Sequence, residues 1–332
     1  MIWLTFFLSA AVIVLAAIKL AEYGDAIGYR TGLGSMFIGT LLVASATSLP
    51  ELLTAINSIR QDVVDLAAGG MLGSNMFNML LLGLLSLLFF RQRVLRRVAM
   101  KHALSGSVAV FVIGLATFFI LARIPLRIGW VGLDSLLVAG VALGGMWLIW
   151  ANVPGNPGAP SAPAPEAEEE GLPSLRRAII GFILASVVLI LASPHLVRSS
   201  AAIADATGLS TGFIGTLALA TITSLPELVT IIAAVRIGAH DMAVGNLFGS
   251  NLFNMFALSL TDLFYTRGNL LGAISPDLAL VGLLGLLLTG IGLIGNQARL
   301  DRLVWVVELD GILLIVGYLV GMWFLYTQGV GL

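Results

Sequence analysis

Residues 38–78 read IGTLLVASATSLPELLTAINSIRQDVVDLAAGGMLGSNMFN, and residues 214–254 read IGTLALATITSLPELVTIIAAVRIGAHDMAVGNLFGSNLFN. The two stretches align without a gap at a constant offset of 176 residues and are identical at 22 of 41 positions. The matches include the polar or helix-breaking pairs Pro50/Pro226 and Glu51/Glu227, which a shared apolar composition does not produce. The chain therefore contains an internal repeat, and this repeat organises its fold.

The chain around the repeats has the composition of a membrane protein. Of its 332 residues, 58% are hydrophobic and 11% charged, against about 45–50% and about 25% in soluble domains. Hydropathy predicts ten spans long enough to cross the ~30 Å hydrocarbon core as helices. They cover residues 2–21, 35–59, 66–90, 102–122, 129–150, 178–197, 209–235, 242–264, 276–296 and 304–327. The first is expected to be a retained span, because it lacks the basic start of a signal peptide.

A stretch rich in Pro, Gly, Ala and Glu, residues 152–173, divides the chain in two and is typical of an unpacked linker. The first half, 1–151, contains the repeat 38–78, and the second half, 174–332, contains the repeat 214–254. The two copies begin in the second and seventh spans, so an odd number of crossings places them in opposite orientations. The sequence thus predicts an all-α membrane protein with about ten transmembrane helices in two inverted five-helix repeats.

The basic residues predict how the protein lies in a cell membrane, because cytoplasmic loops are enriched in Lys and Arg. With the N-terminus outside, twelve of the 17 basic residues fall on the inner side. Both termini are then outside and the linker 152–173 is cytoplasmic. Cysteine is absent, which excludes disulfides and thiolate metal sites.

Each repeat places a carboxylate inside an apolar span, Glu51 in the first and Glu227 in the second. A charge at this depth costs a few kcal/mol and marks a functional site by default. No basic residue lies well inside any predicted span, so a buried Lys or Arg partner is not expected. The duplicated, uncompensated charge instead indicates a cation bound between the two repeats.

The residues around each glutamate supply more oxygen atoms. Helical spacing of three, four and seven residues places small and hydroxyl residues on the same face as each glutamate. They are Ala44, Thr47 and Ser48 in the first repeat and Ala220, Thr223 and Ser224 in the second. Pro50 and Pro226 lack an amide hydrogen, so each is expected to kink its span and free a carbonyl oxygen.

The GSNMFN and GSNLFN elements place Ser74 one turn from Asn78 and Ser250 one turn from Asn254. Two carboxylates with hydroxyl, amide and carbonyl oxygens, and no His or Cys, favour a hard cation such as Ca²⁺, which takes about 6–8 oxygen ligands. Na⁺ is similar in size and competes for the same oxygens. The nearby glycines, among them Gly69 and Gly73, are expected to let helices approach closely.

The paired segments GTLLVASATSLPELLT with GGMLGSNMFN, and GTLALATITSLPELVT with GNLFGSNLFN, resemble the two alpha repeats of the sodium/calcium exchanger family. The resemblance implies that Glu51 and Glu227 are the central acidic ligands of the transported ions. It further implies that the hydroxyls and carbonyls of Thr47, Ser48, Thr223 and Ser224, the carbonyls of Ala44 and Ala220, and the side chains of Ser74, Asn78, Ser250 and Asn254 line the site. The first and sixth spans would slide across the fixed repeat helices.

Two positions depart from the family pattern. Gly70 stands where the second repeat has Asn246, and both Asn78 and Asn254 are amides where many relatives have one acid. The expected site charge is therefore −2. The function predicted is an antiporter that exchanges Ca²⁺ for Na⁺, with no cofactor and no nucleic-acid partner.

The residues leave open exchange for H⁺, since a desolvated glutamate can bind a proton near neutral pH, and exchange for K⁺. A cation channel is a third possibility. An enzyme is not expected, because no nucleophile with a base, no HExxH motif and no phosphate-binding loop is present.

Overall fold

The computed structural model describes residues 2–30, 47–89, 102–151, 173–236, 240–298, 303–304 and 307–328. Residue Ala44, the first residues of the first repeat and residues 152–172 of the linker lie outside these ranges. The elements of the first half are α1 (Ile2–Arg30), α3 (Leu49–Arg60), α4 (Val64–Leu88), α6 (Ala103–Ala122), β1 (Arg127–Ile128), β2 (Val131–Gly132) and α7 (Leu133–Ala151).

The second half has an equivalent series of long helices and a hairpin, with several short helical elements between them. They are α8 (Leu175–Thr207), α9 (Thr211–Ile214), a π-helical turn (Gly215–Leu219), α10 (Ala220–Thr223), α11 (Leu225–Arg236), α12 (His240–Thr261), a 3-10 turn (Asp262–Phe264), α13 (Leu270–Ala273), α14 (Leu278–Ala298), β3 (Leu303–Val304), β4 (Val307–Glu308) and α15 (Leu309–Thr327). Helices α11 and α15 begin and end 176 residues after α3 and α7, so the offset of the repeat extends to the last helix of each half.

Six of the described helices are long and apolar enough to cross a membrane, and the number is seven if the bent stretch Thr211–Arg236 counts as one span. These helices correspond to the predicted spans 2–21, 66–90, 102–122, 178–197, 209–235, 276–296 and 304–327. Their outer faces carry large exposed apolar side chains, such as Leu4 and Trp323, as lipid contact requires. The protein is therefore a multi-pass membrane protein, and its described elements are predominantly helical.

The spans predicted at 129–150 and 304–327 begin later in the structure, at Leu133 and Leu309, because a short antiparallel hairpin precedes each helix. Arg127 pairs with Gly132 in the first hairpin, and Leu303 pairs with Glu308 in the second. In the first hairpin Gly129 has a φ of +68°, a left-handed conformation that glycine adopts without strain. Two-residue pairings of this kind are too short to show an alternating pattern in the sequence.

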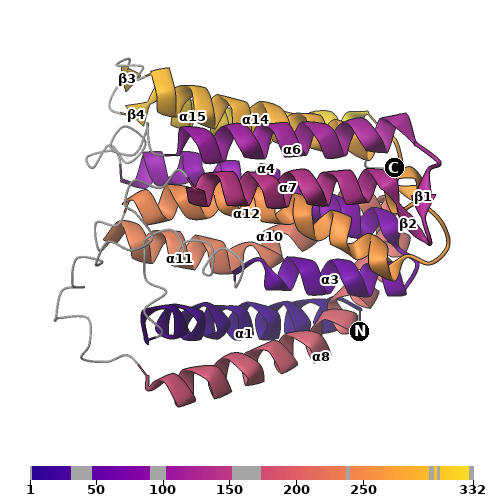
Figure 1. Cartoon of the computed structure of the whole chain (residues 1–332), viewed down its shortest axis with the longest axis horizontal. Helices are drawn as coiled ribbons and strands as arrows, with labels where there is room; N and C mark the ends of the chain where they lie inside the picture. The colour runs from indigo at the N-terminus through magenta and orange to yellow at the C-terminus, as the bar shows by residue number, and fades with distance from the viewer. Residues whose placement is uncertain are drawn as a thin grey trace.

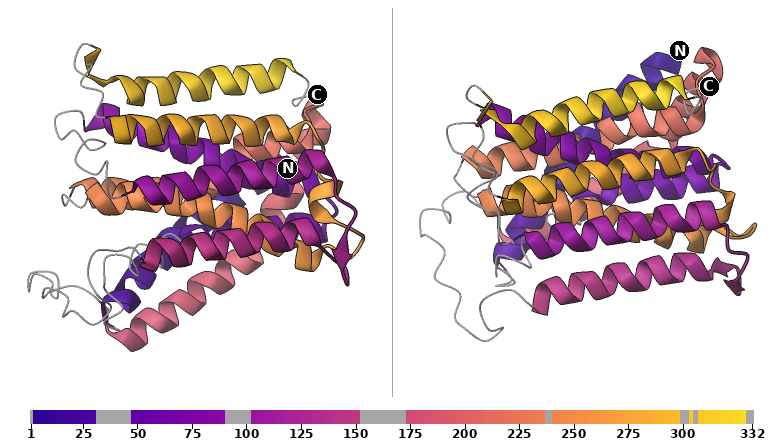
Figure 2. Two further views of the ribbon diagram at one scale, coloured as in Figure 1. Left: turned by 45° about the horizontal axis from the view of Figure 1, so that its top comes forward. Right: turned by 90° about the horizontal axis from the view of Figure 1, so that it is seen from above.

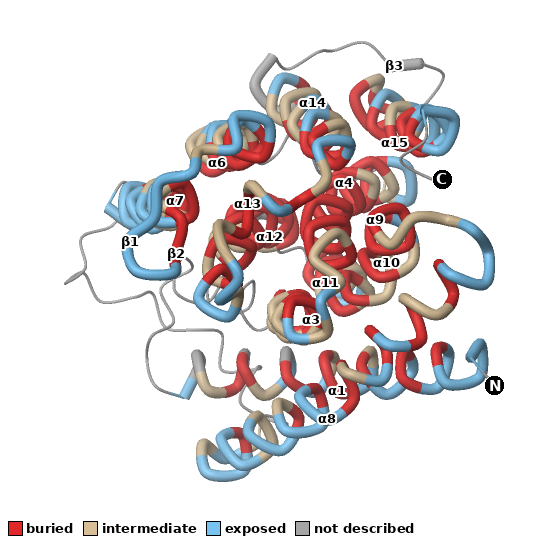
Figure 3. Tube along the Cα trace, turned by 90° about the vertical axis from the view of Figure 1, so that its right-hand side faces the viewer, coloured by how far each residue is buried: buried red, intermediate tan, exposed pale blue. Residues whose placement is uncertain are grey.

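Figures 1 and 2 show the long helices lying side by side in one bundle. Viewed end-on, α4 and α12 lie at its centre and are almost wholly buried (Figure 3). Helices α1 and α8 pack against each other at one edge of the bundle, around apolar residues such as Ile13 and Leu189. This α1–α8 cluster also contains Leu66 of α4 and Ile214 and Leu219 of the second repeat, so α1 and α8 pack directly against the repeat helices. The centre of the bundle, where polar groups have least access to water, is thus formed by the GSN-containing helices of the two repeats.

Candidate functional site

The identical LPEL segments of the two repeats, 49–52 and 225–228, begin the new helices α3 and α11. Helix α10 ends at Thr223, and α11 starts at Leu225 after a bend of 41° between Thr211–Thr223 and Leu225–Arg236. Ser224 and Ser48, at the two equivalent breaks, have nearly the same backbone angles, with φ of −92° and −88°. The predicted break is therefore confirmed in the second repeat by the bend and in the first by the start of α3 at Leu49.

The breaks place each glutamate in the first turn of a helix. Pro50 and Pro226 occupy the second residue of α3 and α11, where the missing amide hydrogen costs nothing. Glu51 and Glu227 follow directly, where the exposed N–H groups of a helix start favour negative charge. The helix start at each proline thus brings the positive end of a helix dipole to the carboxylate. An unbroken helix would not do this.

Each glutamate is bound by a hydroxyl from the other repeat. Ser48 Oγ donates to Glu227 Oε1 at 3.1 Å, and Ser224 Oγ donates to Glu51 Oε1 at 3.0 Å. Both carboxylates are buried, with Glu51 3% and Glu227 1% exposed. Within the described part of the chain no basic residue is found beside either carboxylate, and Lys19–Glu22 and Arg267–Asp62 are ion pairs at the surface.

The GSN-containing helix of the first repeat, α4, also contacts this site. Ser74 Oγ lies 3.1 Å from Ser224 Oγ, which connects α4 to the break before α11. Thr223 Oγ1 donates to the carbonyl of Leu219 at 3.0 Å, and Thr47 is fully buried beside Ser48. Ala220 is buried as well, and its carbonyl oxygen accepts from the amide of Ser224 at 3.0 Å. The structure therefore brings together Ser74 and the break residues of both repeats.

Several buried oxygen atoms of the predicted ligands have no hydrogen-bond partner among the described residues. They are Glu51 Oε2, Glu227 Oε2, Asn78 Oδ1, Asn254 Oδ1 and Ser250 Oγ. A buried polar atom without a partner costs about 1–3 kcal/mol, and more when it is charged. All five belong to the residues that the sequence predicts as ligands, and all are hard oxygen donors. A cation bound among them would satisfy both the hydrogen-bonding deficit and the charge.

The predicted role of the glycines as close-packing residues is confirmed for α4. A Cβ atom on Gly73 would lie 2.6 Å from the backbone of Thr216, so only glycine permits this approach between α4 and the π-helical turn. Close approach brings Ser74, the next residue, within reach of Ser224. The small residue thus positions the site, although it supplies no ligand itself.

Three polar residues of the site were not predicted to have a role. Asn75 and Asn251 are buried between the repeats and bind the predicted ligands Asn254 and Asn78, and Thr289 of α14 binds Asn251. The two asparagines are identical between the repeats, which is the signal that could have identified them. Thr289 could have been noticed as a hydroxyl within an otherwise apolar span.

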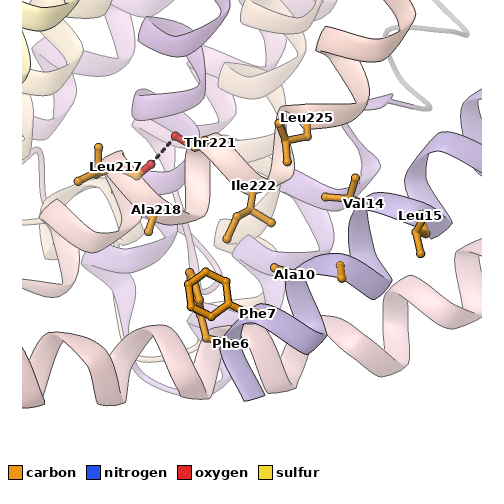
Figure 4. A pocket seen from close by; sticks show the side chains of 11 residues that line it. Phe6, Phe7, Ala10, Val14, Leu15, Leu217, Ala218, Thr221, Ile222 and Leu225 are labelled. Carbon is orange, nitrogen blue, oxygen red and sulfur yellow. Dashed lines mark hydrogen bonds between the residues drawn. The ribbon is translucent and has the colours of Figure 1, made fainter. Parts of the chain in front are cut away.

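A groove of about 750 Å³ lies beside the site, between α1 and the stretch Leu217–Leu225 (Figure 4). Apolar side chains such as Phe6, Val14 and Ile222 line it, together with Thr221. The hydroxyl of Thr221 donates to the carbonyl of Leu217, four residues earlier, at 2.6 Å. This groove therefore lacks the oxygen ligands of a cation site and is suited to apolar contacts.

Comparison with known families identifies the class of protein to which this fold and this cluster of oxygens belong. The model of the family described as sodium/calcium exchanger protein matches residues 1–151 and 177–327. The chain belongs to this family, whose members are membrane exchangers rather than enzymes.

Among its relatives, the Inner membrane protein YrbG of Escherichia coli (strain K12) is 31% identical over 244 residues, which are 68% of this chain and 67% of that protein. Two solved structures are similar in fold to this chain. The H⁺/Ca²⁺ exchanger CAX superimposes with a TM-score of 0.65 at 14% identity, over 99% of this chain and 89% of that one. The sodium-calcium exchanger NCX_Mj, in a structure soaked with Na⁺ and Sr²⁺, superimposes with a TM-score of 0.56 at 20% identity, over 97% and 99% of the two chains.

Proposed function

We propose that the protein is a secondary antiporter that exchanges Ca²⁺ for Na⁺ at the cluster around Glu51 and Glu227. The observation that carries this proposal is the reciprocal pair of bonds from Ser48 to Glu227 and from Ser224 to Glu51. Because each carboxylate is held by the opposite repeat, a cation bound between them interacts with both halves at once. The two carboxylates neutralise a divalent ion shared in this way, and the ion takes the place of the basic partner that they lack.

The ligand set comprises the residues named from the sequence. Glu51 and Glu227 supply the charge, and Asn78, Asn254 and Ser250 supply unpartnered oxygens. The other proposed ligands are all buried: Thr47, Ser48, Ser74, Ala220, Thr223 and Ser224. Ala44 joins this set by its equivalence to Ala220 in the repeat. Such a mixture of carboxylate and neutral oxygens suits Ca²⁺, and it also suits Na⁺ because the two ions are of similar size.

Transport requires that the site open to each side in turn. The proposed layout is ten crossings in two inverted five-helix halves, with both termini outside and residues 152–173 in the cytoplasm. The α1–α8 cluster supports this scheme, because α1 and α8 pack together at one edge of the bundle, against the repeat helices. We propose that α1 and α8 move together along the fixed helices α3, α4, α11 and α12. This movement would open the ion site to one side of the membrane and then to the other.

H⁺ is the second candidate for the driving ion. Two carboxylates lie in one buried site, and Oε1 of each accepts a hydrogen bond from a serine of the other repeat. Oε2 of each has no hydrogen-bond partner among the described residues and could carry a proton. Two protons neutralise the site as completely as two Na⁺ or one Ca²⁺. Exchange for K⁺ uses the same charge balance but a larger ion.

The decisive experiment measures ⁴⁵Ca²⁺ uptake by proteoliposomes loaded separately with Na⁺, with K⁺, or with neither ion at an imposed pH gradient. Uptake that requires internal Na⁺ and saturates with external Ca²⁺ is the expected result. Uptake driven by the pH gradient alone would replace Na⁺ by H⁺ in the proposal. Ca²⁺ flux that needs no counter-ion would overturn antiport in favour of a channel.

A further inference from the structure

Four asparagines form a reciprocal set of hydrogen bonds between α4 and α12. Asn78 Nδ2 donates to Asn251 Oδ1 at 2.9 Å, and Asn254 Nδ2 donates to Asn75 Oδ1 at 3.2 Å. The two bonds are equivalent under the offset of 176 residues, and all four side chains are at most 1% exposed. In each bond the donor is a predicted ligand of the cation, and the acceptor is an asparagine of the other repeat.

This arrangement determines which end of each ligand amide faces the site. An asparagine side chain has an NH₂ group that only donates and an oxygen that only accepts. When the NH₂ group of Asn78 or Asn254 is held by the opposite repeat, its oxygen must point elsewhere. Both oxygens, Asn78 Oδ1 and Asn254 Oδ1, are buried and have no partner among the described residues. They are therefore available as ligands.

The orientation of the Asn251 amide follows from its neighbours. Asn251 Nδ2 lies 3.4 Å from the backbone carbonyl oxygen of Asn75 and 3.2 Å from Thr289 Oγ1. A carbonyl oxygen can only accept, so the NH₂ group of Asn251 must face it. Thr289 uses its own proton to bind the carbonyl of Gly285 at 2.7 Å, which leaves its lone pairs for Asn251. Asn251 Oδ1 is thereby turned to Asn78.

The equivalent hold on Asn75 is weaker. The position 176 residues before Thr289 is Ile113, a buried side chain that cannot accept a hydrogen bond. Asn75 Nδ2 has no partner in the described part of the chain. The pair of Asn75 and Asn254 could therefore turn over together, whereas the pair of Asn251 and Asn78 could not.

We propose that Asn75 and Asn251 are positioning residues that turn the amide oxygens of Asn78 and Asn254 toward the transported cation, and that Thr289 makes this hold firmer on Asn78. The inference rests on the proposed exchange function, because it assigns how two ligands of that site are oriented. Asn78 is the more rigid ligand and Asn254 the more adaptable one. An inverted repeat with identical ligands thus acquires unequal halves through one residue outside the repeat motifs.

The test compares Thr289→Val with Ile113→Val, two changes at equivalent buried positions, of which only the first removes an acceptor. Ca²⁺ affinity is measured in two ways. On the purified protein it is the Ca²⁺ concentration that gives half of the maximal rise in melting temperature. On proteoliposomes it is the half-saturating Ca²⁺ concentration for uptake. We expect Thr289→Val to raise both by about three- to tenfold, as the loss of one buried bond allows. Ile113→Val, which removes no hydrogen-bonding group, should leave both concentrations unchanged.

Thr289→Ser keeps the hydroxyl and should restore the affinity of the unchanged protein. Thr289→Ala provides a second variant without the hydroxyl, should the valine disturb packing. If neither Thr289→Val nor Thr289→Ala weakens Ca²⁺ binding relative to Ile113→Val, the positioning role is wrong while exchange stands. If the unchanged protein neither binds Ca²⁺ nor takes it up, the proposed function itself is wrong.

Discussion

The hydroxyl of Ser224, in the second repeat, donates a hydrogen bond of 3.0 Å to Oε1 of Glu51, in the first. The two residues are 173 positions apart in the sequence, and the bond is mirrored by that from Ser48 to Glu227. Each acid is thus completed by the half of the protein to which it does not belong. A substitution at the serine of one repeat should therefore alter cation binding at the carboxylate of the other repeat.

Replacing either acid should abolish Ca²⁺ transport. Glu51→Gln and Glu227→Gln keep the shape of the side chain but remove half of the charge that neutralises a divalent ion. We expect uptake of ⁴⁵Ca²⁺ to fall to background in both variants, while each protein still inserts and elutes as a folded species in detergent. Glu22→Gln, at an exposed residue paired with Lys19, is the matched control and should transport normally. Near-normal uptake by either site variant would rule out a shared divalent ion.

Removing the serine hydroxyls should weaken binding unequally. A hydrogen bond to a charged group contributes about 1.5–3 kcal/mol, so Ser48→Ala should raise the half-saturating Ca²⁺ concentration by roughly tenfold or more. Ser224→Ala should have the larger effect, because Ser224 contacts both Glu51 and Ser74.

The control for the serine variants is Ser58→Ala. This buried hydroxyl donates to the carbonyl of Thr54 within its own helix, so its loss should leave Ca²⁺ affinity unchanged. Equal affinities in Ser48→Ala, Ser224→Ala and Ser58→Ala would show that the bonds between repeats do not support binding. The measurement is the concentration dependence of uptake in proteoliposomes.

Cysteine labelling should place the linker in the cytoplasm. The chain has no cysteine, so a single one introduced within residues 152–173 is the only thiol. An impermeant maleimide added to intact cells should not modify this cysteine. The same reagent should label the cysteine after the membrane is permeabilised. Arg127→Cys, on the exposed hairpin before α7, should react from outside. The opposite pattern at the two positions would reverse the proposed orientation.

Exchange should be close to electroneutral. The recognised site contains two acids and the two amides Asn78 and Asn254, so one Ca²⁺ or two monovalent ions balance its charge. A third Na⁺ would leave an excess positive charge, which costs several kcal/mol in a buried site. Uptake by the unchanged protein should therefore vary little when the membrane potential is clamped at different values.

Asn254→Asp is the informative variant for charge balance. A third carboxylate should permit an additional monovalent ion and make exchange sensitive to voltage. Proteoliposomes of both proteins are compared at the same clamped potentials with each driving ion supplied separately. Steep voltage dependence in the unchanged protein would instead reveal a third charge in the site.

Much of this architecture can be predicted from the amino-acid sequence. The exact recurrence of Thr-Ser-Leu-Pro-Glu at 47–51 and 223–227 indicates the internal duplication, and Pro50 and Pro226 indicate the helix breaks. These features depend on local rules, since a proline lacks an amide hydrogen and a glutamate in an apolar span needs a counter-charge wherever the chain leads. The two β-hairpins could not be predicted in this way, because a pairing of only two residues has no periodic pattern in the sequence.

Which groups meet across the two halves was decided only by tertiary structure. Spacing within one helix places Ser48 and Glu51 on a common face, yet the bond that forms joins Ser48 to Glu227. Likewise Asn75 and Asn251 appear in the sequence as repeat identities without a role, and Thr289 as a lone hydroxyl in an apolar span, until packing brings them together. Sequence periodicity reports which residues share a face, because that follows from backbone geometry. Contacts between residues more than a hundred positions apart follow from how whole helices pack, and close packing at glycines such as Gly73 sets those distances.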